Sequence, residues 1–280
     1  MRGMTVLYNA KNGCVHVNGD TMDYIAFGKG ERVMIVLPGI GDGLKTARGM
    51  AIPFALMYRQ FAKDFRVFVF SRRRCLPQEY TTRDMACDQI AAMKALGIER
   101  ADVVGVSMGG MIAQWMAIDS PEKIDKLALV VTASRLNETL KESLDAWRRC
   151  AEQGNYVELM LDSAKRMYTD AYLRKNKWMI SVMTRIGRPR SFQRFLIMCH
   201  ACMEHQTYER LSQIHTPTLV IAGAKDRALG VEASKEMAQN IPQCRLQIYE
   251  NYGHAVYEEA KGFNLELRDC LTTKNWNENK

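Results

Sequence analysis

One serine in the chain has neighbours that would make it a nucleophile. Ser107 is the central residue of Gly105-Val106-Ser107-Met108-Gly109, which joins a valine-rich apolar run (102–106) to apolar residues at helical spacing (111–118). A tight turn between a strand and a helix strains the serine backbone and exposes its hydroxyl, and small residues must flank it to avoid collisions. A chance match in a glycine-containing turn is the alternative, so the motif needs partners elsewhere in the chain.

A serine hydroxyl is a weak nucleophile until a base takes its proton. Asp226 follows an apolar run (217–223), and His254 follows another (245–249), so each is expected just past the carboxyl end of a strand. Such ends meet in one crevice of a parallel sheet, and the order Ser, Asp, His is typical of this kind of turn. The pattern predicts Ser107 as nucleophile, His254 as general base and acid, and Asp226 as the group that orients the imidazole.

Taken singly, each of these residues has a simpler explanation. An aspartate after a strand is usually a turn or capping residue, and a loop histidine is usually a structural one. The other four histidines are interpreted as structural, namely His16, His200, His205 and His215. The triad is favoured because separate signals fall in one topological order.

A glycine-rich loop is the candidate for stabilising negative charge on the reacting oxygen. The buried strand predicted at 33–37 ends in Pro38-Gly39-Ile40-Gly41-Asp42-Gly43. The spacing of Lys45 and Thr46 does not fit a phosphate-binding loop, and there is no dinucleotide fingerprint. We expect the backbone N–H of Ile40, with Gly41 as second choice, to form an oxyanion hole with the N–H of Met108 at a helix N-terminus.

Alternating strand and helix patterns predict the fold class. An Asn-Gly turn at 18–19 between two alternating runs indicates an N-terminal antiparallel hairpin. Further strands are expected at 33–37, 65–70, 102–106, 126–131, 217–223 and 245–249, with the sequence 71–74 as a loop after the second of these. Helical patterns between them, such as 85–97, predict an α/β fold with a mostly parallel, doubly wound sheet.

Between residues 133 and 215 the strands disappear and amphipathic helical patterns take over, at 140–150, 156–168, 170–184 and 191–208. We expect residues 1–132 and 216–280 to form the core, and 133–215 to form a helical lid (cap) over the carboxyl edge of the sheet. Methionines and aromatic residues there could line an adaptable apolar pocket: Met160, Met167, Met179, Met183, Met198, Met203, Trp147, Tyr168, Tyr172, Trp178, Phe192 and Phe195. For any one of them, packing within the protein is the simpler interpretation.

Composition limits the possible partners. The chain has 280 residues, 8 cysteines and a net charge of +8, but neither a membrane-span-length apolar run nor a nucleic-acid motif. Cys199-His200-Ala201-Cys202 lies in an apolar helical pattern, so it is interpreted as core rather than as a metal site. The first nine residues lack the sustained apolar run of a signal peptide. We expect a cytoplasmic protein with thiol cysteines and without cofactor or metal; a homo-oligomer stays open.

The chain resembles the α/β-hydrolase superfamily, in the lidded single-domain branch of small esterases, C–C bond hydrolases and prolyl aminopeptidases. The resemblance rests on Leu37-Pro38-Gly39-Ile40-Gly41, Gly105-Val106-Ser107-Met108-Gly109-Gly110, Gly223-Ala224-Lys225-Asp226 and Gly253-His254, and it runs from about residue 20 to 262. Pro38-Gly39 stands where the family often has His-Gly, and Ser71-Arg72-Arg73-Arg74 where it often has Asp-x-Arg-Gly. The role of the three arginines is open.

These features predict a serine hydrolase that works through an acyl-enzyme on a small ester, thioester or amide, with a carboxylic ester as first choice. The substrate is expected to be apolar, or anionic, because residues 135–215 carry 14 lysines and arginines against 9 acidic residues. Cleavage of a C–C bond on the same fold is one alternative. The other is a ligand-sensing protein of this fold with little turnover.

Overall fold

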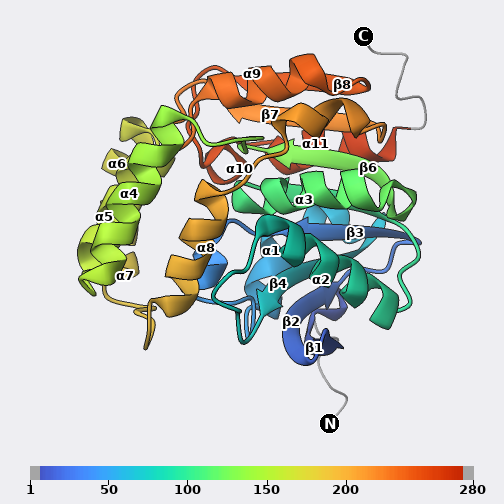
Figure 1. Ribbon diagram of the computed structural model, residues 1–280, viewed down its shortest axis with the longest axis horizontal. Helices are drawn as coiled ribbons and strands as arrows, with labels where there is room; N and C mark the ends of the chain where they lie inside the picture. Colours follow the sequence, from blue (N-terminus) through green and yellow to red (C-terminus); the bar gives the residue numbers. More distant parts are fainter. Residues whose placement is uncertain (1–6, 274–280) are drawn as a thin grey trace.

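The computed structural model describes residues 7–273, apart from the side chains of Met179 and Met183 (Figure 1). The expectation about the first residues of the chain therefore lies largely outside the described part. One eight-stranded sheet has the order β1-β2-β4-β3-β5-β6-β7-β8. Its strands are β1 (Lys11–Val17), β2 (Asp20–Phe27), β3 (Arg32–Leu37), β4 (Phe65–Arg73), β5 (Ala101–Val106), β6 (Ile124–Val130), β7 (Thr218–Gly223) and β8 (Cys244–Tyr249).

The sheet is antiparallel at its start and parallel elsewhere. Strand β1 pairs with β2, and β2 with β4, in antiparallel fashion, whereas the pairs from β4 through β3 to β8 are parallel. Asn18 and Gly19 form the hairpin turn with φ angles of 48° and 79°, a backbone that asparagine and glycine adopt readily. The predicted mostly parallel sheet with an N-terminal hairpin is confirmed.

Helices cover both faces of the sheet, which explains the uninterrupted apolar sequences of the central strands. Every residue of β5 and β7 is buried. The helices α2 (Thr82–Ala95), α3 (Met108–Asp119) and α9 (Val231–Asn240) pack on one face. On the other face lie α1 (Ala51–Met57) and α11 (Phe263–Thr272), with the short α10 (Val256–Glu259) beside them.

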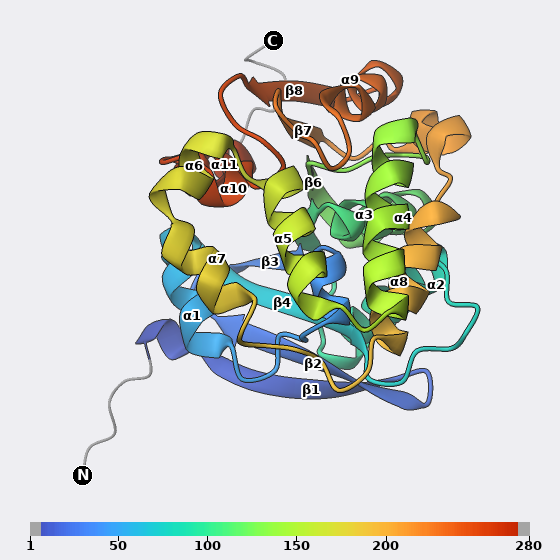
Figure 2. The same cartoon turned by 90° about the vertical axis from the view of Figure 1, so that its left-hand side faces the viewer.

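Five α-helices and the 3-10 helix η5 (Tyr208–Gln213) stand between β6 and β7, where the sequence predicted only helices. The α-helices are α4 (Glu138–Glu152), α5 (Tyr156–Met167), α6 (Asp170–Lys175), α7 (Lys177–Met183) and α8 (Gln193–Met203). We call α4 to α8 the helical insertion. Figures 1 and 2 show it as a layer at one end of the sheet. Asn137, Asn155 and Thr169 cap the N-termini of α4, α5 and α6 through their side chains, as polar residues do there.

Two expectations about element boundaries are wrong. Strand β4 does not end at residue 70 but continues through Arg73, because the antiparallel strand β2 pairs with it as far as Met22 opposite Arg73. The single helix expected at 170–184 is broken at Asn176 (φ −114°, ψ 34°). The side-chain amide of Asn176 donates to the carbonyl of Tyr172 at 3.0 Å, and such local bonds compete with the helix.

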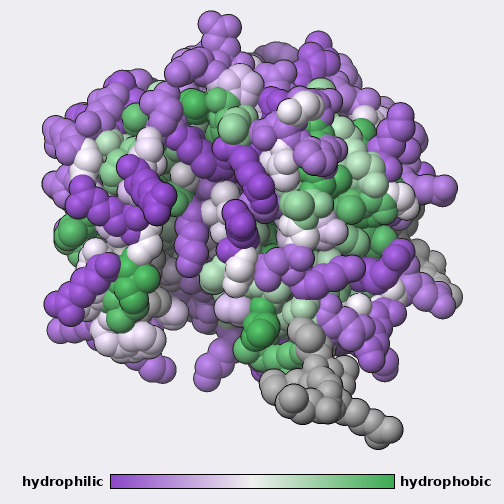
Figure 3. Space-filling view, turned by 90° about the horizontal axis from the view of Figure 1, so that it is seen from below, coloured by the Kyte–Doolittle hydropathy of each residue, from purple (hydrophilic) through white to green (hydrophobic). Residues whose placement is uncertain are grey.

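One face of the molecule mixes polar and apolar side chains. On the face in Figure 3, apolar side chains form separate patches among hydrophilic ones. Within residues 7–273, no helix combines the length and the apolar character that crossing a bilayer requires.

A buried carboxyl group at the start of β5 should make stability depend on pH. Burial raises the pKa of Asp102 to about 7, although Arg32 nearby acts to lower it. Arg32 Nη2 donates to Asp102 Oδ2 at 2.6 Å, while Oδ1 is buried without a partner. Because this pKa lies above the unfolded value of about 3.9, the folded state holds the extra proton. The stabilisation that comes from protonation of Asp102 in the folded state is therefore complete below about pH 4 and is lost as pH rises through about 7.

We expect the substitution Asp102→Asn, which removes this titration, to raise Tm relative to the native chain more at pH 8 than at pH 5. Thermal unfolding followed by circular dichroism at both pH values measures this difference. The variant Asp119→Asn, at a partly exposed carboxyl that pairs with Arg83, controls for the change of net charge. An Asp102→Asn variant with the native pH dependence would contradict the expectation.

Candidate active site

Ser107 lies at the turn between β5 and α3 in a strained backbone conformation. Its φ of 53° and ψ of −121° are rare for a residue with a side chain. Two hydrogen bonds hold the turn: the N–H of Ser107 donates to the Val130 carbonyl at 2.9 Å, and the Thr132 hydroxyl donates to the Ser107 carbonyl at 2.7 Å. Ser107 is thus held between β5, α3 and the end of β6.

The flanking glycines make this turn possible. A Cβ atom on Gly105 would lie 2.5 Å from the carbonyl oxygen of Gly109, and one on Gly109 would lie 1.9 Å from the carbonyl oxygen of Leu37. Both distances are far below any real van der Waals contact. The close approach of α3 to β5 and β3 therefore requires glycine at these two positions.

Asp226 and His254 come together although they are far apart in sequence. Asp226 Oδ2 lies 2.8 Å from His254 Nδ1, and both side chains are 3% exposed. The other carboxylate oxygen, Oδ1, accepts the backbone N–H groups of Ala228 and Leu229 at 2.8 and 2.9 Å. Burial acts to raise the pKa of Asp226, but His254 and the two N–H groups outweigh burial and lower it.

This hydrogen bond fixes the imidazole. An ionised Asp226 accepts a hydrogen bond from Nδ1–H, so the neutral ring carries its proton on Nδ1 and keeps the lone pair on Nε2. The arrangement is that of a histidine prepared to accept a proton on Nε2. Asp226 and His254 lie in the loops after β7 and β8, where the sequence placed them.

Ser107 and His254 line the same cavity, which has a volume of about 350 Å³. The cavity lies between the sheet and the helical insertion. Its wall is mostly apolar, formed by Met50 and Phe54 from the core side and by Trp147, Met160, Met167 and Phe195 from the insertion. A cavity of this size and character suits a small organic molecule.

The glycine-rich loop lies directly beside Ser107. A Cβ atom on Gly39 would be 3.3 Å from Ser107 Cβ. Ile40 is the first residue of the short 3-10 helix η2 (Ile40–Gly43), and Met108 is the first residue of α3. Backbone N–H groups at these positions have no acceptor within their own helix. The two N–H groups expected to bind an oxyanion are thus both helix-terminal, and their role stays a prediction.

The apolar residues of the insertion divide between cavity and packing. Of the twelve methionines and aromatic residues that the sequence suggested for the pocket wall, Trp147, Met160, Met167, Tyr168 and Phe195 line the cavity. Met198 is buried in the core, and Trp178 is 68% exposed. Met179 and Met183 have side chains outside the described part. Hydropathy cannot separate these groups, because a pocket wall and a core have the same composition.

One acidic residue of the cavity wall was missed by sequence reasoning. Glu258 in α10 lines the cavity and accepts a hydrogen bond from the Tyr168 hydroxyl at 2.6 Å. Its neighbour Glu259 accepts from the N–H and the hydroxyl of Thr169 at 3.0 and 2.6 Å. Burial raises the pKa of Glu258, although the Tyr168 bond opposes this. Glu258 and Glu259 thus join the insertion to the core. In the sequence, only the position of Glu258 shortly after His254 could have suggested that it lines the cavity.

His205 and the two cysteines of α8 lie in the interior of the protein. His205 is buried between the hydroxyls of Thr82 (2.8 Å) and Thr207 (3.2 Å), and burial lowers its pKa to about 3. Cys199 and Cys202 are core residues of α8, whereas His200 is exposed. Among residues 7–273, no three acidic, histidine or cysteine side chains gather in a group that could hold a metal ion.

Comparison with known proteins places most of the chain in one family of folds. Residues 32–261 match the model of the alpha/beta hydrolase fold family. The chain is 25% identical over 248 residues to 3-oxoadipate enol-lactonase 2 of Acinetobacter baylyi, with 87% of this chain and 90% of that protein covered. It is 27% identical over 280 residues to a 2-hydroxy-6-oxononadienedioate/2-hydroxy-6-oxononatrienedioate hydrolase of a Pseudomonas species, covering 93% and 92%.

A solved structure agrees with the architecture. The enol-lactonase of Burkholderia xenovorans superimposes with a TM-score of 0.80 at 23% identity, covering 93% of this chain and 100% of that one. At this identity the likeness establishes the fold.

The crowding at the turn leads to a stability prediction. We expect Gly109→Ala to lower the free energy of unfolding by at least about 1–3 kcal/mol, the usual cost of overpacking, because its Cβ would meet the Leu37 carbonyl. Urea unfolding measures the change. The matched control is Gly41→Ala, since a Cβ there meets nothing within 4 Å. Equal stability of the two variants would show that α3 can move away from β3 at little cost.

Proposed function

Because this chain belongs to the alpha/beta hydrolase fold family, we propose that it is a serine hydrolase that cleaves small carboxylic esters through an acyl-enzyme. The observation that carries the proposal is the 2.8 Å Asp226–His254 hydrogen bond, with His254 lining the same cavity as the strained Ser107. This arrangement supplies a nucleophile, a base and a carboxylate that orients the base.

The proposed reaction has two halves. Ser107 Oγ attacks the carbonyl carbon of the ester while His254 Nε2 takes the hydroxyl proton. The N–H groups of Ile40 and Met108 stabilise the tetrahedral oxyanion, each contributing about 3 kcal/mol. The intermediate collapses to an acyl-enzyme, and the departing alcohol receives the proton from His254. Water then attacks the acyl carbon while His254 takes one of its protons, and His254 returns that proton to Ser107 Oγ as the acid is released.

We propose an apolar acyl group for the substrate and a lid function for residues 133–215. Trp147, Met160 and Phe195, all from this region, form part of the cavity wall, and their removal would open the cavity to water. An anionic acyl group is the alternative, supported by Lys45, which also lines the cavity. We further propose a cytoplasmic location, which suits the exposed free thiols of Cys14, Cys75 and Cys87.

A second candidate is hydrolysis of a C–C bond next to a ketone. It is supported by the Pseudomonas relative, which is named as a hydrolase of 2-hydroxy-6-oxononadienedioate and matches 93% of this chain. The same Ser107 and His254 would serve, but the leaving group would be a carbanion that must receive a proton. Rates of hydrolysis of a ketone of the class for which that relative is named, and of a series of esters, therefore distinguish the two candidates.

The substitution Ser107→Ala tests the nucleophile. We expect it to abolish labelling by a fluorophosphonate probe and to lower kcat on p-nitrophenyl esters by at least about 10⁴-fold, because the other groups leave only residual catalysis. In-gel fluorescence and initial rates measure the two effects. Thr132→Val, which removes only the hydroxyl that bonds the Ser107 carbonyl, is the comparison. Undiminished labelling of the alanine variant would exclude Ser107 as nucleophile.

The cavity leads to a prediction about acyl length. With p-nitrophenyl esters of increasing length, kcat/KM should rise about fourfold per methylene buried, corresponding to about 0.8 kcal/mol each. It should fall once the acyl chain exceeds the cavity of about 350 Å³. Steady-state kinetics over the series measures this. Turnover confined to the ketone would support the C–C candidate, and thermal stabilisation by ligands without turnover would support a sensor.

A further inference from the structure

The loop that carries Ile40 rests on a buried arginine. Arg72, near the carboxyl end of β4, is fully buried. Its Nη2 donates to the Pro38 carbonyl at 2.6 Å, two residues before Ile40. A buried guanidinium is costly unless it is paired, so this interaction ties the start of the loop to the sheet.

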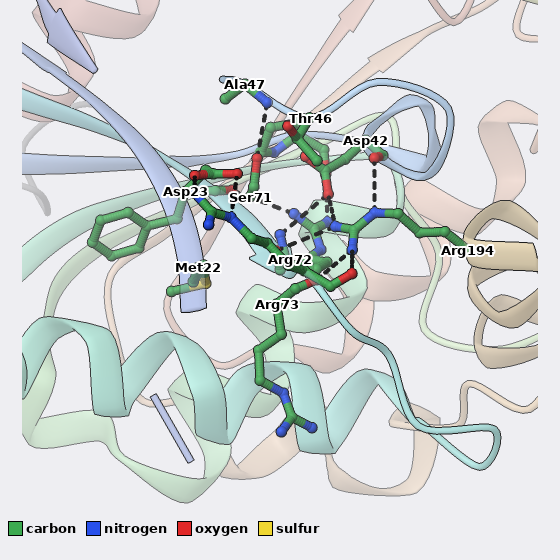
Figure 4. A network of polar contacts seen from close by, with 12 residues as sticks. Met22, Asp23, Asp42, Thr46, Ala47, Ser71, Arg72, Arg73 and Arg194 are labelled. Atoms are coloured by element: carbon green, nitrogen blue, oxygen red, sulfur yellow. Dashed lines mark hydrogen bonds and ion pairs between the residues drawn. The ribbon is translucent and has the colours of Figure 1, made fainter. Parts of the chain in front are cut away.

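The side chain of Asp42 joins the same loop to two further groups. Asp42 belongs to η2, directly after the Ile40–Gly41 segment, and its side chain is almost completely buried. Its Oδ2 accepts the backbone N–H of Arg72 at 3.1 Å and Nη2 of Arg194 at 2.7 Å. In Figure 4 the side chains of Arg72 and Arg194 approach Asp42, whereas Arg73 points away.

Arg194 comes from the helical insertion. It lies in α8, and its guanidinium also donates from Nε to the Asp42 carbonyl at 3.2 Å, from Nη2 to the Arg72 carbonyl at 3.2 Å, and to the Arg73 carbonyl. One planar side chain therefore connects α8, η2 and the end of β4. Helix α8 also touches the loop directly, since a Cβ on Gly43 would lie 2.9 Å from Phe195 Cα.

The three consecutive arginines thus have separate partners. Arg73 pairs with Asp88 of α2 at 2.7 Å, and Arg74 pairs with Asp23 of β2 at 2.6 Å. Of the three, Arg72 alone points to the loop.

From these contacts we propose that Arg194 is a positioning residue, which acts through Asp42. Together with Arg72, which holds the Pro38 carbonyl, it fixes the orientation of the backbone N–H of Ile40 for oxyanion binding. The inference rests on the proposed function. Asp42 lines the cavity, whereas Arg194 is absent from the described residues that do, so Arg194 acts through the loop and not on the substrate. The insertion is thereby part of the catalytic geometry as well as a cover.

The proposal makes a specific kinetic demand. An oxyanion donor contributes only if it lies at hydrogen-bond distance from the developing charge, and a displacement of about 1 Å can cost 10²-fold in rate. Loss of Arg194 should therefore weaken binding of the tetrahedral state and leave ground-state binding unchanged. A purely structural role would lower the folded fraction or Tm without this distinction.

The test compares Arg194→Gln with the native chain and with Arg188→Gln. The control removes an exposed arginine that donates a hydrogen bond to the Gly154 carbonyl, which belongs to the same region between β6 and β7. For Arg194→Gln we expect kcat on p-nitrophenyl esters to fall about tenfold to hundredfold at unchanged KM. The affinity for a trifluoromethyl ketone, which adds to Ser107 as a tetrahedral oxyanion, should fall by the same factor. Arg188→Gln should match the native chain in both, and Arg194→Lys should recover part of the loss.

Two further measurements keep the outcome clear. The rate of fluorophosphonate labelling of Ser107, which needs no knowledge of the substrate, should also fall at least tenfold in Arg194→Gln. In a double-mutant cycle, Asp42→Asn should cost little once Arg194 is replaced, because the two act as a unit.

Native kcat, ketone affinity and labelling rate in a folded Arg194→Gln variant would overturn the proposal. So would a loss that follows the folded fraction measured by circular dichroism. Failure of the proposed function has a different signature, namely a native chain in which Ser107 is neither labelled nor needed for turnover.

Discussion

The whole site depends on how closely backbone approaches backbone around Ser107. The Leu37 carbonyl fills the space beside Gly109, and the Gly109 carbonyl fills the space beside Gly105. Gly39 lies against the side chain of Ser107. These contacts bring the end of β3, the end of β5 and the start of α3 together at one point. As a consequence, the loop that leads into η2 and the first residue of α3 lie next to Ser107, whose backbone is strained.

The pKa values of two buried carboxyl groups near Ser107 shift in opposite directions, and the hydrogen-bond partners of the two groups explain why. Asp226 receives two backbone N–H groups as well as the imidazole, which together outweigh its burial and lower its pKa. Glu258 receives a hydrogen bond from Tyr168 and lies next to Glu259, so burial prevails and its pKa rises. The number of donors aimed at a carboxylate, more than its depth, decides whether it stays charged. The site thus holds a charge where His254 needs one.

Sequence reasoning succeeded where a residue's position follows from the chain's local order. Ser107, Asp226 and His254 could be placed at one sheet edge because parallel strands all end there, and the Asn18-Gly19 hairpin follows from local backbone preference. The length of β4 and the burial of Arg72 could not be predicted, because they depend on pairing with β2 and on Asp42. Likewise Phe195 in the cavity and Met198 in the core look alike as sequence. Such distinctions arise from contacts between distant segments, which hydropathy does not contain.

The position of α8 in the sequence and its contacts in the fold assign it to different parts of the protein. By sequence α8 belongs with the helices between β6 and β7, yet Arg194 fastens it to η2 and β4, and Asp42 and Arg72 are buried beneath it. Moving α8 away would take the Arg194 guanidinium from the buried Asp42 carboxylate and from the carbonyls of Arg72 and Arg73. Leaving a buried carboxylate without its charged partner is strongly destabilising. Mechanically, α8 is thus part of the wall that the core presents to the cavity, although the chain reaches it only after the other helices of the insertion.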